Sequence, residues 1–301
     1  RQMCIRDRIE NVVVKQKKLL THEEILDGIS LANMLPGPMA VNTAAYVGYK
    51  IRGGMGAVVS TTAIILPAFI FMTAMTAFYL ENGQTASFAS IFLGFIPAVV
   101  AVIISTIINM AKKNVKRLEQ LLLCIAGGAA FYFTKGIFAT LAIIATAGII
   151  GYFFLGKKQK EQRESETVVV RISKSGMISN IAILLILGCC LLLFLNPTSH
   201  EGQDIHVQLV ATFGGMSLVL FGGGYVFIPF IQEVIVTGKG WLTNREFTDA
   251  IAIGQVTPGP IMMSAAFVGY KLKGILGAIL ATIGIFAPTA ALVVVVARFA
   301  E

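Results

Sequence analysis

Two Pro-Gly-Pro triplets, Pro36-Gly37-Pro38 and Pro258-Gly259-Pro260, are the residues best suited to chemistry in this chain. Each proline removes a backbone donor and disfavours helical geometry in the residue before it, so a helix should end at each triplet. Proline suits the first position of a helix, which predicts that a new helix begins near Pro38 and near Pro260. The N–H groups at such a start carry partial positive charge and suit an anion. A kink that serves only packing is the alternative interpretation.

Polar side chains flank both triplets. Asn33 and Gln255 lie three residues before the first proline of each triplet. Asn42, Thr43, Thr257 and Ser264 lie close to the triplets along the chain, and such side chains donate hydrogen bonds to an oxyanion that has lost its water. We predict a substrate site from these residues and the triplets. The alternative is that each hydroxyl bonds only to its own helix backbone. A glycine run, Gly222-Gly223-Gly224, is a further candidate, either as a close packing contact or as unwound backbone that faces the anion.

Asp27 and Asp249 occupy matching positions, each within a turn of a Thr-x-x-Glu pattern that starts at Thr21 or Thr243. That pattern is a capping box, which satisfies backbone donors at a helix start. Acids in the first turns also suit the helix dipole. An acid that enters a membrane segment is expensive, however, and often marks an ion or proton path. Both aspartates are therefore candidates for coupling or gating.

Lys50 and Lys271 end a Val-Gly-Tyr-Lys motif in each half of the chain. Twelve helical residues separate Pro38 from Lys50, or about 18 Å at 1.5 Å per residue. We therefore expect these lysines to attract an anion at the mouth of a pathway, or to reach the membrane surface, rather than to contact an anion at the triplet. They remain candidates for gating.

The composition excludes most soluble classes. The 301 residues are 56% hydrophobic and 13% charged, whereas soluble domains carry about a quarter charged residues. Apolar runs at 54–80, 88–110, 136–155, 177–195 and 275–299 approach the ~20 helical residues that cross a bilayer. The bilayer core holds no water to bond the backbone N–H and C=O groups, so segments that cross it are expected to form helices. The sequence predicts an all-α, multi-pass integral protein of the cytoplasmic membrane.

The formal net charge of +8 does not indicate a nucleic-acid partner. The basic residues lie at the ends of apolar runs, where they set topology, and no basic and aromatic face is interleaved. The sequence contains no nucleophile–base pair, metal-ligand cluster or cofactor loop. We expect no enzyme, no metal and no cofactor, with the lipid bilayer and a small anion as partners. The oligomeric state stays open, a homo-oligomer included.

An internal duplication organises the chain. Residues 20–50 (LTHEEILDGISLANMLPGPMAVNTAAYVGYK) match residues 242–271 (LTNREFTDAIAIGQVTPGPIMMSAAFVGYK), and the match continues through Pro67 and Pro288. Paired repeats are typical of secondary transporters, with the substrate site where the repeats meet. We expect a first repeat at 9–155, a charged cytoplasmic linker at 156–176 and a second repeat at 177–301. Residues 1–8 match nothing in the second copy, and we interpret them as non-native. The first repeat would then lack its first helix, and the second its C-terminal helices.

The direction of the repeats stays open. If each Pro-Gly-Pro segment crosses the membrane, the two halves are inverted and Lys271 lies outside. If each segment doubles back as a re-entrant hairpin, the halves are parallel and both Lys50 and Lys271 lie inside. The basic run from Lys15 to Lys18 favours the hairpin.

These motifs resemble the chromate transporter family. The resemblance rests on FGGGYVFIP at 221–229, Trp241-Leu242-Thr243, GQVTPGP at 254–260 and FVGYK at 267–271, with LANMLPGP and YVGYK in the first copy. It implies a secondary transporter that exports chromate across the cytoplasmic membrane, confers chromate resistance, and exchanges or competes with sulfate. A carrier of sulfate or another small anion, which chromate mimics, is the alternative. A membrane scaffold or membrane-embedded enzyme is the third hypothesis.

Overall fold

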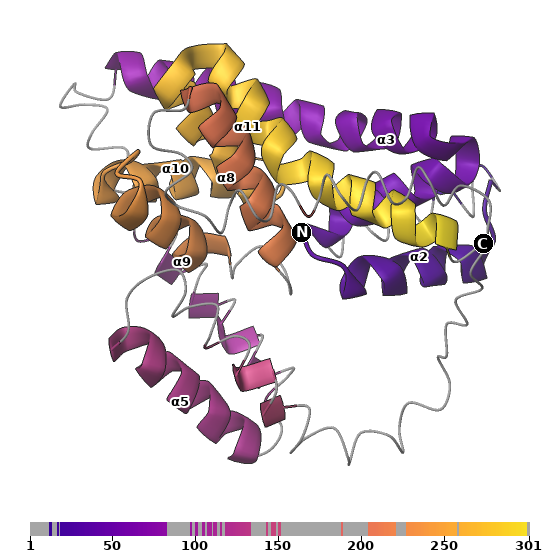
Figure 1. Cartoon of the computed structure of the whole chain (residues 1–301), viewed down its shortest axis with the longest axis horizontal. Helices are drawn as coiled ribbons and strands as arrows, with labels where there is room; N and C mark the ends of the chain where they lie inside the picture. The colour runs from indigo at the N-terminus through magenta and orange to yellow at the C-terminus, as the bar shows by residue number, and fades with distance from the viewer. Residues whose placement is uncertain are drawn as a thin grey trace.

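The computed structural model describes residues 19–82, 118–133, 204–220, 227–257 and 259–299 continuously, with isolated positions within 12–17, 97–115 and 143–151 and at 188. Every regular element in these residues is a helix (Figure 1), which confirms the all-α prediction. The elements are α2 (His22–Met34), α3 (Met39–Asn82), α5 (Leu118–Phe133), α8 (Ile205–Val219), α9 (Phe227–Ile231), the π-helix η6 (Gln232–Gly238), α10 (Asn244–Val256), the 3₁₀ turn η7 (Ile261–Met263) and α11 (Ser264–Phe299). Residues 1–8 and the linker at 156–176 lie outside the described residues.

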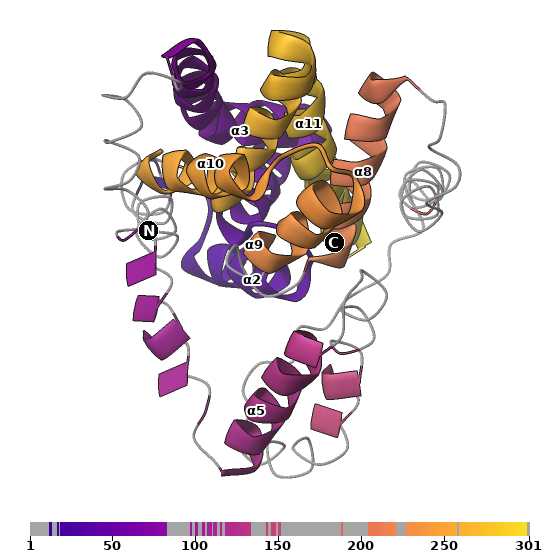
Figure 2. The same cartoon turned by 90° about the vertical axis from the view of Figure 1, so that its left-hand side faces the viewer.

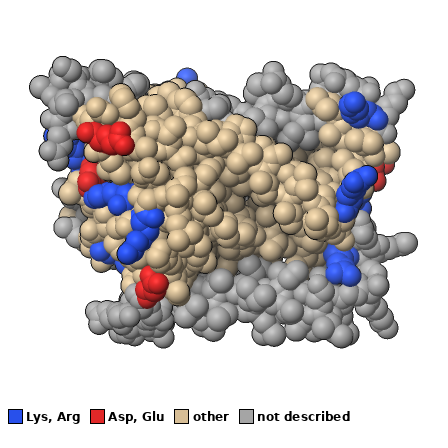
Figure 3. All heavy atoms as spheres, turned by 90° about the horizontal axis from the view of Figure 1, so that it is seen from above, with Lys and Arg blue, Asp and Glu red and all other residues tan. Residues whose placement is uncertain are grey.

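Two helices of the described residues, Met39–Asn82 and Ile261–Arg298, are long and apolar enough to cross a membrane. Both run along the long axis of the molecule (Figure 1). On the face shown in Figure 3, the charged side chains gather at the two ends of this axis, and an uncharged band lies between them. That distribution is the one expected of a protein whose middle sits in hydrocarbon.

Each long helix turns back on itself at a glycine. Gly53 and Gly274 have φ of 61° and 60° and ψ of −151° and −149°, so the two halves share the same backbone turn. Glycine suits this turn, because residues with a side chain rarely adopt a positive φ. We refer below to the stretches before the turn (39–51 and 264–272) and the stretches after it (54–82 and 275–299).

Glycines also let the backbones meet next to each turn. A Cβ on Gly48 would overlap the carbonyl of Gly56, and a Cβ on Gly269 would overlap the carbonyl of Gly277. The Ser60 hydroxyl adds a 2.7 Å hydrogen bond to the carbonyl of Ala44 across the first crossing. Small residues in membrane helices allow this kind of close backbone contact.

Each Pro-Gly-Pro triplet is the tip of a helical hairpin. In the first hairpin (residues 22–51), α2 packs against the stretch 39–51, where the Tyr46 ring fills the space beside Gly28 and contacts Ile25 and Ile29 in one apolar cluster. In the second hairpin (residues 244–272), Glu246 at the start of α10 pairs with Lys271 across the base. The triplets at 36–38 and 258–260 therefore lie at the ends of the hairpins farthest from these bases.

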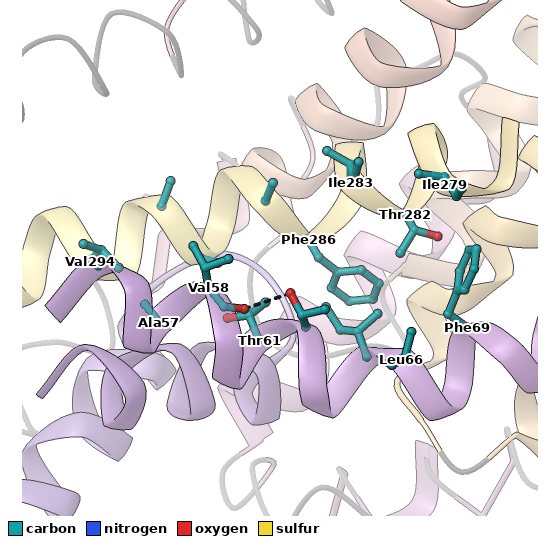
Figure 4. Close-up of a pocket in the computed structure, with 16 residues that line it drawn as sticks. Ala57, Val58, Thr61, Leu66, Phe69, Ile279, Thr282, Ile283, Phe286 and Val294 are labelled. Atoms are coloured by element: carbon teal, nitrogen blue, oxygen red, sulfur yellow. Dashed lines mark hydrogen bonds between the residues drawn. The ribbon is translucent and has the colours of Figure 1, made fainter. Parts of the chain in front are cut away.

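The stretches 54–82 and 275–299 pack side by side in opposite directions. Ala57 and Val294 lie at one end of their contact, while Phe69 and Ile279 lie at the other (Figure 4). A doubled-back triplet is expected with parallel halves, but here doubled-back triplets occur with antiparallel long helices. The reason is that the triplet is a local feature, which does not determine the relative direction of the two long helices.

Shorter helices pack around α11 in the second half of the chain. α8 packs along α11, where Gly284 approaches Val210 and Phe213 closely, and Phe213 is fully buried. η6 packs against both α9 and α10, whereas α5 lies apart from the packed helices (Figure 2). The main core joins residues of α8, η6, α10 and α11 with Val41, Ile65, Ala68 and Met72 of α3.

Candidate functional site

The tip of the first hairpin lies against the second half of the chain. Gly37 has φ of 99°, a conformation that favours glycine. Its N–H donates a 2.9 Å hydrogen bond to the carbonyl of Leu220, the residue that ends α8. A Cβ on Gly37 would lie 2.7 Å from Cγ2 of Thr289, one residue beyond Pro288 in α11. Leu220 and Thr289 thus hold the tip on both sides.

The tip of the second hairpin makes the reciprocal contact. A Cβ on Gly259 would overlap the Cβ of Ala68, one residue beyond Pro67 in α3. The Gly259 N–H donates a 2.9 Å hydrogen bond to the carbonyl of Thr257. Each tip therefore packs on the other half's long helix at an equivalent point. Pro258 itself lies outside the described residues.

New helical turns begin directly after both triplets. α3 begins at Met39, and the N–H groups of Val41 and Asn42 donate to the carbonyl of Pro38 at 2.9 and 3.0 Å. In the second hairpin the N–H of Met263 donates to the carbonyl of Pro260 at 2.9 Å. The first N–H groups of a helix have no partner inside it, so they point back toward the triplets.

Two buried polar atoms lie directly after the tips. The Asn42 side chain donates a 2.9 Å hydrogen bond to the carbonyl of Pro36, but its Oδ1 atom has no partner among the described residues. The hydroxyl of Ser264 has no partner there either, although Ser264 is 1% exposed. A buried polar group without a hydrogen bond is costly, so these two atoms are suited to bond a ligand beside the tips.

Thr43 and Thr257 fit the alternative interpretation, in which a hydroxyl bonds to the backbone of its own helix. The Thr43 hydroxyl donates to the carbonyl of Met39 at 2.8 Å, and the Thr257 hydroxyl donates to the carbonyl of Gly254 at 2.7 Å. Both bonds stay within one helical turn and satisfy the hydroxyl donor locally.

The other predicted binding residues are less well placed. Asn33 is exposed on α2, and Gln255 is half-buried near the end of α10. The glycines at 222–224 lie outside the described residues. Leu220, two residues before this run, accepts the hydrogen bond from Gly37 at the first tip.

The two matching aspartates have different environments. Asp27 is exposed on α2, whereas Asp249 is buried at 3% exposure. The Tyr79 hydroxyl of α3 donates a 2.7 Å hydrogen bond to Oδ2 of Asp249, and the Tyr79 ring packs against Phe267. Sequence reasoning missed Tyr79, because no motif marks it and the pair is 170 residues apart along the chain.

The two lysines belong to the hairpin bases. Lys271 forms an ion pair of 2.6 Å with Glu246 and donates to the carbonyl of Trp241 at 3.4 Å. Burial alone would raise the pKa of Glu246, but hydrogen bonds from Lys271 and Thr243 outweigh it and hold that pKa below its usual value. Hydrogen bonds from Thr21 likewise lower the pKa of Glu24, helped by the charge of Lys50. Both lysines therefore lie a hairpin's length away from the tips.

A cavity of about 680 Å³ lies between the stretches 54–82 and 275–299 (Figure 4). Its wall is mostly apolar, with Thr61, Thr62 and Thr282 as the hydroxyl-bearing residues. The Thr62 and Thr282 hydroxyls donate to carbonyls of their own helices, while the buried Thr61 oxygen has no partner among the described residues. An apolar wall of this kind does not suit a desolvated anion.

Comparison with known proteins supports a transport protein. The family model described as "Chromate transporter" matches residues 7–152 and 207–301. The chain is 30% identical to an uncharacterized transporter of Methanocaldococcus jannaschii, covering 93% of this chain and 68% of the relative. It is 27% identical to a chromate transport protein of Cupriavidus metallidurans and 27% identical to one of Pseudomonas aeruginosa. These alignments cover 92% and 94% of this chain and 64% and 65% of the relatives.

The chain spans about two-thirds of the length of these curated relatives. No solved structure matches it. The family model covers both copies of the Pro-Gly-Pro hairpin, and the resemblance noted from the motifs is confirmed. This chain belongs to the chromate transporter family.

Proposed function

We propose that the protein is a secondary transporter that moves chromate or a related tetrahedral oxyanion across the cytoplasmic membrane. Family membership supports chromate as the substrate. The observation that carries the mechanism is the reciprocal packing of the two tips, Gly37 on Thr289 and Gly259 on Ala68. This packing brings both helix starts to the middle of the opposite long helix.

The two copies act as an inverted pair in this proposal. The hairpins enter from opposite ends of the molecule, because each base lies beside the C-terminal end of the other half's long helix. Two broken helices that meet near mid-depth form a typical transporter site. Helix starts favour negative charge, and the side chains of Asn42 and Ser264 supply polar atoms that bond the oxyanion or the water it retains.

Transport in this scheme requires the tips to part on one side at a time. The lysines at the hairpin bases, Lys50 and Lys271, attract the anion toward each entrance, where charge is less expensive than at the tips. The protein then carries chromate outward and confers resistance. A carrier of sulfate is the second candidate, because sulfate is also a tetrahedral dianion and the described residues at the tips include no group that distinguishes the two anions.

Flux of labelled chromate into proteoliposomes containing the full chain tests the proposal. We expect saturable uptake that excess sulfate reduces, and a loss of at least about tenfold in the double variant Pro38→Ala/Pro260→Ala, which removes the residues that set both helix starts. Cys124→Ser, at an exposed position of α5, is the control and should transport normally. Correctly inserted protein that moves neither chromate nor sulfate would contradict the proposal.

A further inference from the structure

A side-chain hydrogen bond between half-buried Tyr79 and buried Asp249 joins the two halves of the protein. Tyr79 belongs to the long stretch 54–82 of the first half, and Asp249 belongs to the second hairpin. The pair thus holds the second hairpin against the helix on which its tip also packs, at Ala68. A movement of this hairpin away from α3 must break the bond.

The described part of the first hairpin shows no equivalent of this pair. Its matching acid, Asp27, is exposed on α2. If the register that aligns Lys50 with Lys271 is continued, Tyr79 aligns with Ala300, which carries no hydroxyl. Both copies of the repeat therefore have the aspartate, but the first copy alone has the tyrosine. The Tyr79–Asp249 contact is thus not explained by the duplication.

Asp249 has no ion-pair partner among the residues that the structure describes. On its own helix, Arg245 and Glu246 act on it with opposite sign. From α11, Lys271 is engaged with Glu246. Glu233 of η6 and Lys239, which follows η6, are the titratable residues there, and Lys239 lies over the Trp241 ring. From α3, the Tyr79 hydroxyl is the group that contacts the Asp249 carboxylate.

We propose that Tyr79 and Asp249 form a proton-sensitive latch that closes the second hairpin on α3 when Asp249 is ionised and releases it when Asp249 takes up a proton. This inference rests on the proposed transport function and assigns a coupling role to Asp249 but not to Asp27. One proton moves from water to the carboxylate as the latch opens, and the same proton returns to water as it closes. No bond other than O–H forms or breaks.

The physical reason is the change in the acceptor. A hydrogen bond to an ionised carboxylate is roughly twice as strong as one to a neutral group. A carboxylate removed from water is costly unless it is hydrogen-bonded, so Asp249 stays ionised only while Tyr79 donates to it. Protonation weakens the bond and removes the charge that the hairpin would otherwise carry through the membrane interior. Opening and protonation are therefore favoured together.

Two transport assays in proteoliposomes separate coupling from binding. The first measures chromate exchange at equal pH, and the second measures net chromate flux driven by a pH gradient. Asp249→Asn mimics the protonated acid, so we expect exchange within about twofold of wild type but gradient-driven flux reduced about tenfold or more. Asp27→Asn is the matched control and should retain both activities. Gradient-driven flux at the wild-type level in Asp249→Asn would overturn the latch.

Hydrogen exchange gives a readout that does not depend on chromate. In lipid nanodiscs, the protection of α10 should fall about tenfold on acidification relative to α2 in the wild type, and should stay low at both pH values in Asp249→Asn and in Tyr79→Phe. Tyr79→Phe keeps the ring against Phe267 and removes only the donor. If wild type shows this change but moves no chromate, the substrate is wrong and the latch stands. If α10 protection is independent of pH in the wild type, the latch is wrong.

Discussion

Gly259 faces Ala68 so closely that a single methyl group on the glycine would overlap the Cβ of the alanine. The contact joins the tip of the second hairpin to the middle of α3, and Gly37 makes the corresponding contact with Thr289 of α11. Because both contacts lie one residue beyond a helix proline, the two tips meet opposite helices at equivalent points. The fit between tip and helix is therefore a direct target for mutation.

Gly259→Ala should displace the second tip and reduce transport by on the order of 10- to 100-fold, since small misplacements in a site are costly. Ala68→Gly removes the atom that the new methyl would meet, and the other neighbours of that methyl are at 3.8 Å or more. The double variant should therefore recover most of the flux. The measurement is chromate uptake in proteoliposomes at matched protein insertion. Failure of Ala68→Gly to rescue would show that steric contact with α3 is not the cause.

Gly269→Ala should lower the stability of the second half, because the added Cβ would overlap the carbonyl of Gly277 and backbone cannot yield as a side chain does. Overpacking of this kind costs about 1–3 kcal/mol. Thermal unfolding in detergent should show a lower Tm. Gly54→Ala is the control, since nothing lies within 4 Å of its added Cβ, and it should leave the Tm equal or higher. Equal Tm values for the two variants would refute the close crossing.

Lys271→Met should destabilise the base of the second hairpin, because Glu246 would lose its 2.6 Å partner. The pair is partly exposed, so we expect a loss of about 1 kcal/mol in unfolding free energy. Glu246→Gln should lower the unfolding free energy less in the Lys271→Met protein than in the wild type. A double-mutant cycle measures this difference. Lys112→Met, at an exposed position, should have no effect. Strict additivity of the two changes would argue against the pair.

The same pair predicts a dependence on pH. The lowered pKa of Glu246 means that the folded state favours the ionised carboxylate. Its stabilising contribution is complete above the ordinary glutamate pKa of about 4.3 and is lost as the pH falls through the lowered pKa. Unfolding free energies of wild type and Glu246→Gln should therefore converge in acid and differ at neutral pH. A difference that stays constant with pH would assign the effect to packing.

Ser264→Ala should separate stability from substrate binding. The Ser264 hydroxyl is buried and has no partner among the described residues, so its removal should leave the Tm unchanged or raise it. If the hydroxyl donates to the anion, the KM for chromate should rise about fivefold or more, as loss of one hydrogen bond predicts. Thr43→Val is the comparison, since Thr43 donates within its own helix, and its KM should change less. An unchanged KM in Ser264→Ala would remove this residue from the site.

Local sequence chemistry determined several features without the structure. The end of α2 before Pro36 and the start of α3 after Pro38 follow from proline sterics, which depend on neighbouring residues alone. The capping boxes at Thr21 and Thr243 are also local, and both are present. The helical class follows from long apolar runs, because lipid leaves the backbone no other partner.

Only the tertiary structure decided how these elements meet. The sequence placed Asp27 and Asp249 at matching positions, but burial and the Tyr79 hydrogen bond distinguish them. The contacts of Gly37 with Thr289 and of the second tip with α3 join residues far apart in the chain, and no local pattern encodes such distances. The antiparallel course of the long helices likewise follows from how they pack against each other, not from a local pattern. Proline and glycine chemistry thus determined where each helix breaks, while long-range packing determined what each break faces.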